Sequence, residues 1–377
     1  MDSHLPLISV VVPAYRVAAF LPECLDSILA GSGAEVEVVG VDDHSPDECP
    51  RILDAYARRD PRMRVVHLPA NSGLPAARNT GLAHARGAYV WFVDGDDWLP
   101  EGALGAVTDR LVSTRPDVLV VGHVEVHPDG TRVPRLPPPD DGRPPGPLAQ
   151  RTHLLRVDHS ACTKVVRRDL LTANGLRFTP GWYEDGPFSH ALLLTARRID
   201  VLDRVCYCYR RRGEGTITGS VSHRHFEVFD QYQRLWAMVD SSDAYQRFRP
   251  DLFRLMIDHY LVIAGNPRRL PPGSRRAFFR RMAADYRRRL PPGGYPMPDG
   301  VGRIKHELVR RDAYLAYALL RQVWRMPRLL GLARGRAAAP ARPATPRRAP
   351  ARWSGGGRGP VPGDSRPATR TGDAPSR

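Results

Sequence analysis

The chain has 377 residues, 42% of them hydrophobic, and a formal net charge of +16. This length fits one large or two ordinary globular domains, and the charge favours anionic partners such as nucleotides, phospholipid headgroups or nucleic acid. The sequence has no run of about 18 apolar residues that could span a bilayer and no basic N-terminal signal segment, so we expect a cytoplasmic protein. Five cysteines without a CxxC pair predict reduced thiols.

Apolar runs alternate with segments of helical spacing through the first third of the chain. Continuous apolar or β-branched runs predict buried strands, and apolar residues three and four apart predict helices. The expected strands are 7–14, 35–41, 63–68, 89–93 and 117–126, with helices at 20–29, 49–59, 71–85 and 101–113 between them. This alternation is typical of an α/β protein with a mostly parallel, Rossmann-like sheet flanked by helices.

Two acidic clusters follow predicted strands. Asp42 and Asp43 follow one, and Asp94, Asp96 and Asp97 follow another. Ligands of open α/β sheets bind beyond the carboxyl ends of the strands, and crowded carboxylates suit a hard divalent cation. The alternative is a solvated turn whose acids cap the next helix. No GxGxxG follows the first strand and no GxxxxGK[ST] occurs, so a standard dinucleotide or P-loop domain is excluded.

The second half of the chain is predicted to contain a long loop, a further set of strands and helices, and a tail. We expect a hairpin turn at 127–130 and a mobile Pro- and Gly-rich loop to residue 150. Structure should resume with strands at 161–167 and 199–209, a loop at 178–188, and helices to 195 and over 223–264, 272–289 and 300–324. Residues 331–377 are Arg, Pro, Ala and Gly with few aliphatic residues, which predicts disorder.

Five short motifs occur in a fixed order along the chain. They are SVVVPAY at 9–15, VDDHS at 41–45, NSGLPAARNTG at 71–81, GAYVWFVDGDD at 87–97 and YEDG at 183–186. Together they resemble a family-2 glycosyltransferase with a GT-A fold, over about residues 5–215. His44 and Arg16 depart from the family's usual residues at their positions, which bears on donor preference.

The resemblance implies an enzyme that uses a nucleotide-diphosphate sugar, a UDP-sugar by preference. Asp94 and Asp96, with Asp97, would hold Mn²⁺ or Mg²⁺ against the diphosphate. The donor would also contact Pro13, Ala14, Tyr15, Asp42, Asp43, Arg78, Asp94 and Gly95. Tyr15 would stack on the base, or alternatively be a partly buried loop aromatic. Arg78 would approach phosphate oxygens, or alternatively be solvated in the first turn of its helix.

The resemblance makes Asp185 the candidate base, which takes the acceptor proton in a single inverting displacement. Adjacent Glu184 and the apolar residues around it would raise its pKa toward neutrality. Trp182 and Glu184 are the candidate acceptor contacts. The alternative is an ordinary acidic helix N-terminus.

We therefore expect a catalytic domain at 1–215, a helical region at 216–330 and a disordered tail at 331–377. The expected acceptor is a glycan, polyol-phosphate or lipid-linked molecule of the cell envelope. A competing hypothesis is an anion-binding module that uses the Arg-rich C-terminus on membrane or nucleic acid. The acidic sheet edge argues against nucleic acid. Residues 307–330 interleave Leu and Trp with Arg, which predicts either a helix packed on the catalytic domain or peripheral contact with the anionic inner face of the membrane.

Overall fold

The computed structural model describes residues 6–31, 33, 35–139, 142–212 and 219–323. Its centre is a mixed, mostly parallel sheet in the order β3-β2-β1-β4-β7-β5-β6, with β8 also paired to β5. The strands are β1 (Ile8–Ala14), β2 (Val36–Asp42), β3 (Met63–His67), β4 (Tyr89–Phe92), β5 (Val118–Val126), β6 (Arg132–Arg135), β7 (Lys164–Arg167) and β8 (Ile199–Arg210). The predicted α/β class and the first five strands are confirmed within a residue or two.

The sheet is parallel from β3 to β4 and then changes direction. β7 pairs antiparallel with both β4 and β5, and so separates two strands that follow one another in the sequence. β5 and β6 form the hairpin predicted at 127–130, where His127 N donates to Thr131 O at 2.9 Å. The parallel contact of β5 with β8 completes the sheet.

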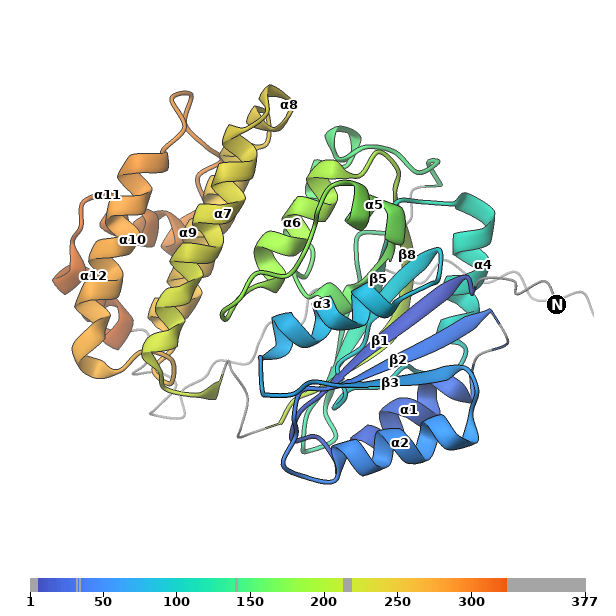
Figure 1. Cartoon of the computed structure of the whole chain (residues 1–377). Coiled ribbons are helices and arrows are strands. Elements are labelled where there is room, and N and C mark those ends of the chain that lie inside the picture. The colour runs from blue at the N-terminus through green and yellow to red at the C-terminus, as the bar shows by residue number, and fades with distance from the viewer. Residues whose placement is uncertain (1–5, 32, 34, 140–141, 213–218, 324–377) are drawn as a thin grey trace, which may run out of the picture. The chain divides into compact units, whose positions relative to one another are not determined.

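Helices cover both faces of the sheet (Figure 1). One face packs on α1 (Leu21–Leu29), α2 (Cys49–Arg59) and α4 (Ala103–Thr114). The other packs on α3 (Leu74–His84), α5 (Arg168–Ala173) and α6 (Asp185–Thr195). β1 and β2 are fully buried because both faces are covered, which explains their near-continuous apolar sequences.

A close approach fixes α3 on the sheet. A Cβ atom at Gly81 would lie 2.2 Å from Val11 Cγ1, so only glycine lets this helix lie directly on β1. Because the missing Cβ lets α3 lie this close to β1, the residues one turn before Gly81 also come close to the sheet. Arg78 is one of them.

A helical layer follows β8. It consists of α7 (Glu227–Asp240), α8 (Asp243–Gln246), α9 (Arg249–Gly265), α10 (Arg275–Arg289), α11 (Gly300–Arg310) and α12 (Tyr314–Val323). α7 packs on α6, so its apolar residues continue the core of the α3 face. The single helix predicted over 300–324 is wrong: Asp312, with a φ of 53°, breaks it into α11 and α12.

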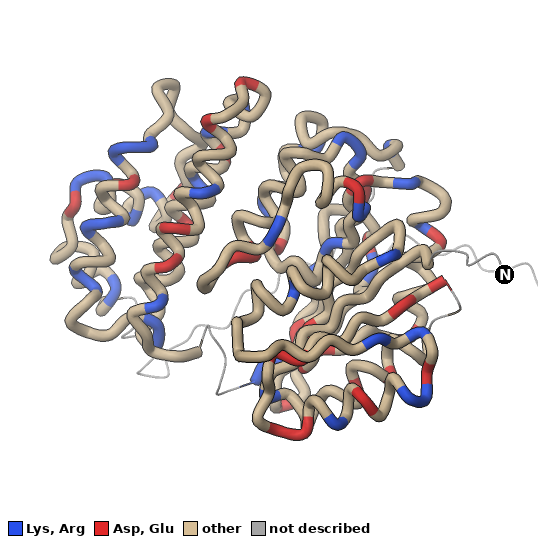
Figure 2. The backbone as a smooth tube through the Cα atoms, in the orientation of Figure 1, with Lys and Arg blue, Asp and Glu red and all other residues tan. Residues whose placement is uncertain are grey.

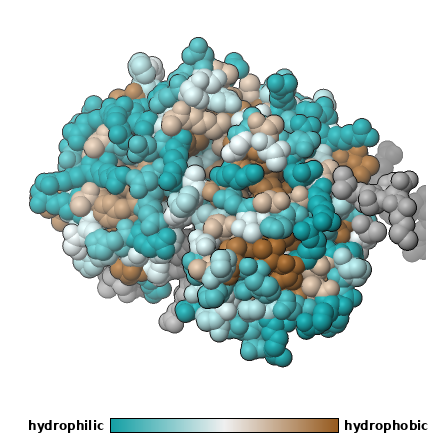
Figure 3. All heavy atoms as spheres, viewed as in Figure 1, coloured by the Kyte–Doolittle hydropathy of each residue, from teal (hydrophilic) through white to brown (hydrophobic). Residues whose placement is uncertain are grey.

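All five cysteines are unpaired, in keeping with the predicted reduced thiols, and all five are buried. No helix within the described ranges combines the length and the apolar character that crossing a bilayer demands. The tail predicted to be disordered, 331–377, lies outside the described residues. Figure 3 shows a face of the molecule that is mostly hydrophilic, with apolar side chains in scattered patches.

Candidate functional site

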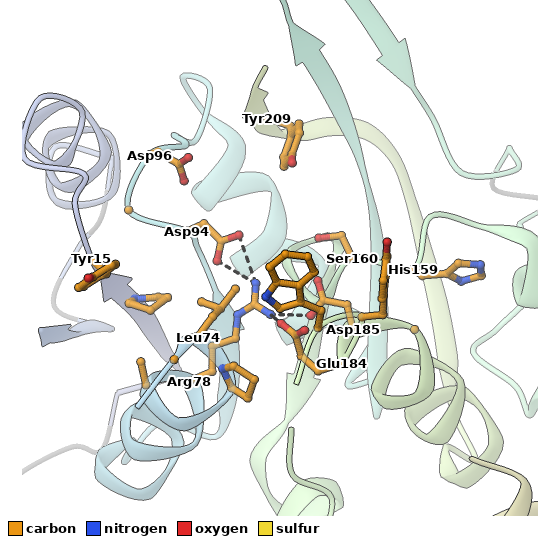
Figure 4. Close-up of a pocket in the computed structure, with 18 of the residues that line it drawn as sticks. Tyr15, Leu74, Arg78, Asp94, Asp96, His159, Ser160, Glu184, Asp185 and Tyr209 are labelled. Atoms are coloured by element: carbon orange, nitrogen blue, oxygen red, sulfur yellow. Dashed lines mark hydrogen bonds and ion pairs between the residues drawn. The ribbon is translucent and has the colours of Figure 1, made fainter. Parts of the chain in front are cut away.

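A cleft of about 730 Å³ opens at the carboxyl ends of the parallel strands. Its walls come from the segments after β1 and β4, the start of α3, and the loop that leads into α6 (Figure 4). The predicted residues that line it are Pro13, Ala14, Tyr15, Asp43, Arg78, Asp94, Gly95, Asp96, Trp182, Glu184 and Asp185. The structure thus brings most of the predicted residues, 172 positions apart at the extremes, into one cavity.

The two acids after β2 have different surroundings. The carboxylate oxygens of Asp43 accept hydrogen bonds from Ser72 N at 2.7 Å and Gly73 N at 2.8 Å, and so hold the loop that opens α3. Asp42 is buried outside the cleft lining, where it accepts from Ser45 N at 2.9 Å and contacts His67 Nδ1 at 3.0 Å. Asp43 therefore faces the cleft, whereas Asp42 supports the strand end behind it.

Tyr15 lies at the mouth of the cleft. Its side chain is exposed, and the guanidinium of Arg16 lies 5.3 Å from its ring centroid. The alternative of a partly buried loop aromatic does not describe this position, because the ring is accessible to a flat ligand. Arg16 itself has a positive φ of 54°, which turns the chain sharply away from β1.

Arg78 is the centre of the charged network. It is 1% exposed and donates through Nη2 to Asp94 at 2.8 Å, and through Nη1 to Asp185 at 2.5 Å and Glu184 at 3.2 Å. The expected alternative of a solvated first-turn residue is therefore wrong. Its Nε, also buried, has no hydrogen-bond partner in the part of the chain that the structure describes.

The three acids after β4 do not point the same way. Asp94 and Asp96 line the cleft, and Asp96 forms an ion pair with Arg212 at 2.6 Å. Asp97 is buried instead: Tyr207 Oη donates to it, and so does Arg210 N at 2.7 Å. A metal ligand would have to line the cleft beside Asp94 and Asp96, and Asp97 does not. The structure therefore contradicts its predicted role as a metal ligand.

Asp94 and Asp96, the two acids that line the cleft, are close enough for their negative charges to affect one another, which suits a bound cation. Burial raises the pKa of Asp96, and the charge of Asp94 raises it further. Magnesium is commonly bound through one or two carboxylates, with waters and substrate phosphates completing its shell. Two cleft-facing carboxylates therefore fit Mn²⁺ or Mg²⁺ held together with a diphosphate. No cluster of three potential ligands occurs among the described residues, so the protein alone would not complete the shell.

Asp185 and Glu184 begin α6 at the opposite wall of the cleft. Burial raises the pKa of both carboxyl groups; the charge of Asp185 adds to the effect at Glu184, and Arg78 opposes it at both. Tyr183 just before them has a φ of 68°, a strained conformation for a tyrosine that turns the loop into the helix. The predicted loop over 178–188 is shorter, since α6 starts at Asp185.

Several cleft residues were not predicted from the sequence. They are His123, Asp158, His159, Ser160, Tyr207, Tyr209, Arg211, Arg212, Arg224, His259 and Arg269. They stand in segments without a recognisable motif, and only the pairing of β8 with β5 and the packing of α7 and α9 bring them here. Trp182, which was predicted, carries the guanidinium of Arg224 at 4.8 Å from its ring centroid.

Comparison with known proteins gives a consistent result. The model of glycosyl transferase family 2 matches residues 9–172. An uncharacterised glycosyltransferase of Bacillus subtilis, EpsJ, is 34% identical over 214 residues, which is 55% of this chain and 61% of that protein. The TarS protein of Staphylococcus aureus, a poly(ribitol-phosphate) β-N-acetylglucosaminyltransferase, is 31% identical over 225 residues, or 58% of this chain and 38% of its own.

A solved structure agrees with the sequence relatives. The crystal structure of S. aureus TarS 1–349 with UDP-GlcNAc has a TM-score of 0.52 and 25% identity, covering 74% of this chain and 72% of that one. This chain matches less than two thirds of the length of EpsJ and of TarS as whole proteins. The matched segment, residues 9–172, contains β1 to β7 and both acidic strand ends, and this segment matches glycosyl transferase family 2 within a GT-A fold.

Proposed function

We propose that this protein transfers a sugar from a nucleotide-diphosphate sugar to an acceptor hydroxyl, with inversion at the anomeric carbon. The observation that carries the proposal is that Asp94 and Asp185 face one cleft from opposite walls and are held by the same guanidinium of Arg78. A donor site and a proton acceptor are thus within reach of one bound substrate pair.

The donor would lie along the ends of β1, β2 and β4. Tyr15 offers an accessible ring for the base. The oxygens of Asp43 each keep a lone pair after accepting from Ser72 and Gly73, so one can also accept from the base. Asp94 and Asp96 would hold Mn²⁺ or Mg²⁺, which neutralises charge on the leaving diphosphate. Arg212, which pairs with Asp96, adds positive charge to the same part of the cleft.

The acceptor would lie on the side of the cleft formed by residues 181–186, the loop before α6 and the first residues of that helix. Asp185 would take the hydroxyl proton as the acceptor oxygen bonds to the anomeric carbon and the bond to the diphosphate oxygen breaks. This single displacement inverts the configuration. Burial favours the basicity of Asp185, while Arg78 keeps it ionised enough to act near neutral pH. Trp182 and Glu184, which line the same cleft, would contact the acceptor.

The substrate class is inferred from the relatives. TarS is named for transfer of N-acetylglucosamine to poly(ribitol-phosphate), and its solved complex contains UDP-GlcNAc. Another relative, TuaG of B. subtilis, is a putative teichuronic acid biosynthesis glycosyltransferase with 40% identity over 97 residues. We therefore propose a UDP-sugar donor and a polysaccharide or polyol-phosphate acceptor of the cell envelope.

The test is a panel of nucleotide sugars, with and without Mn²⁺. Binding should raise the melting temperature of the protein by mass action, and UDP-sugars should do so most strongly when Mn²⁺ is present. The Asp185→Asn variant should give the same shift but no transfer. The proposal would be contradicted if no nucleotide sugar raised the melting temperature, with or without Mn²⁺.

A further inference from the structure

The outward face of α12 is apolar although nothing described covers it. Leu315, Leu319 and Val323 recur every fourth residue and are 75%, 63% and 61% exposed. A helix at the surface of a globular protein normally presents polar residues on its outer side. Three large aliphatic side chains in one row, on a single ten-residue helix, therefore point to something that covers them.

The inward face of α12 packs against the rest of the protein. Tyr317 is buried against Phe279 at a ring-centroid distance of 5.0 Å, and Arg321 donates to Ala264 O at 3.3 Å. The expectation that this helix packs on the rest of the protein is thus met on one side only. Leu308 on α11 also packs on the core. The exposed row is a second apolar face, which core packing does not explain.

The charge of the chain is concentrated at the same end. Residues 1–274 contain 32 Lys and Arg and 34 Asp and Glu, whereas residues 275–377 contain 24 and 6. The whole positive surplus of the protein therefore comes from α10 onward. Figure 2 shows Lys and Arg at several positions along α10 to α12. Arg303, Arg310 and Arg311 are exposed on α11 and the turn after it, and Arg310 and Arg311 share Glu307 as their ion-pair partner.

We propose that the outer face of α12 docks the protein on an anionic lipid bilayer. Aliphatic side chains on one face of a helix insert at the boundary of headgroups and acyl chains, while surrounding basic residues meet anionic headgroups. Each Lys or Arg close to such a surface strengthens the attraction. The two features, apolar row and basic surroundings, are the two that an interfacial helix needs.

Charge complementarity makes a bilayer a better partner than the alternatives. A second copy of this chain would bring two strongly basic regions together, and the chain's own basic segment after α12 has the same sign of charge. Nucleic acid would match the charge, but bases stack on aromatic rings rather than on an aliphatic row. The bilayer matches both the charge and the aliphatic side chains.

The docking face and the cleft are connected through packed helices. α12 packs on α10, and α10 packs on α9, which supplies His259 and Val262 to the cleft wall. Docking at α12 would thus place a lipid-borne or envelope-bound acceptor near the enzyme. The proposal itself does not rest on glycosyl transfer, because it concerns binding to lipid alone.

Co-sedimentation with vesicles tests the proposal with the full chain. One set of vesicles is pure phosphatidylcholine, and the other contains equal parts phosphatidylcholine and phosphatidylglycerol. The parent protein should sediment with the anionic vesicles at low salt, and added salt should weaken binding. The Leu315→Gln/Leu319→Gln/Val323→Gln variant should bind at least about tenfold more weakly, because the aliphatic contribution is lost.

The matched control is Val112→Gln on α4, which removes an aliphatic side chain of similar exposure, 58%, from the part of the chain without a basic surplus. It should bind vesicles like the parent. The thermal midpoint of each variant shows that it is folded. Equal vesicle binding by parent and triple variant, or no binding by the parent at low salt, would overturn the proposal. So would a dimer that the triple substitution abolishes.

Discussion

Asp94 and Asp185, which are far apart in the sequence, are bound to opposite nitrogens of one buried guanidinium. Arg78 Nη2 lies 2.8 Å from Asp94 Oδ1, and Nη1 lies 2.5 Å from Asp185 Oδ1. This bridge couples the strand end that we propose faces the donor to the helix that carries the candidate base. A single substitution at Arg78 should therefore affect both walls of the cleft.

We expect Arg78→Met to destabilise the protein by roughly 3–5 kcal/mol, because it leaves the buried Glu184 and the partly buried Asp94 and Asp185 without their cation. Arg78→Lys should cost less stability, since it keeps the charge, but should still reduce activity because one ammonium cannot replace the two-pronged contact. Urea denaturation followed by circular dichroism measures the first effect. Arg177→Met, at an exposed position, is the control and should leave stability unchanged. Equal stability of Arg78→Met and the parent would show that the network is not structural.

Asp185→Asn should reduce turnover by at least about 10²-fold while leaving donor affinity unchanged, as expected for loss of a general base. Donor binding is measured by thermal shift and turnover by release of the nucleotide diphosphate. Asp169→Asn, an exposed acid on α5, is the matched control and should have full activity. A variant that loses donor binding but keeps its turnover at saturation would move Asp185 to the donor side.

Asp96 and Asp97 are neighbours with opposite expected roles. Asp96→Asn should abolish Mn²⁺-dependent nucleotide binding and leave the melting temperature unchanged, because the side chain faces the cleft. Asp97→Ala should lower stability by roughly 1–3 kcal/mol, because Tyr207 Oη and Arg210 N lose their acceptor inside the protein. Titration with Mn²⁺ and thermal unfolding of the two variants separate the roles. Full nucleotide binding by Asp96→Asn in Mn²⁺ would exclude it as a ligand.

His190 should make the protein sensitive to mild acid. It is fully buried on α6, and burial lowers its pKa well below the ordinary value, with His159 and Lys164 adding positive charge nearby. The unfolded state then binds a proton at a higher pH than the folded state does. The contribution of neutral His190 to the free energy of unfolding is therefore fully present above the unfolded pKa of about 6.5. It is lost as the pH falls below that value.

The measurement is the free energy of unfolding from neutral pH down to pH 4. His190→Leu should show a shallower loss below pH 6.5 than the parent, because the buried proton acceptor is gone. His153→Leu, at an exposed position, is the control and should follow the parent curve. Parallel curves for His190→Leu and the parent would show that this histidine does not contribute to the acid response.

The fold class and the position of the cleft follow from the pattern of apolar runs and acidic strand ends. The apolar runs at 7–14, 35–41 and 89–93 specify strands covered on both faces, because only a buried strand tolerates such continuous hydrophobicity. The acids after the second and fourth strands then had to lie at the same sheet edge, since parallel strands place their carboxyl ends together. Tyr15, Asp43, Asp94, Asp96 and Asp185 were located by that reasoning and by the family's motifs.

Which of those side chains contact one another depends on packing between segments that are distant in the chain. Nothing local in the sequence shows that Arg78 meets Asp185, that Asp97 turns inward to Tyr207, or that β7 separates β4 from β5. Likewise, both faces of α12 are apolar in sequence, and only packing against Phe279 shows which face is left exposed. Periodicity records whether a residue is buried, but the partner of a buried charge or of a helix face is set by contacts between segments distant in the chain.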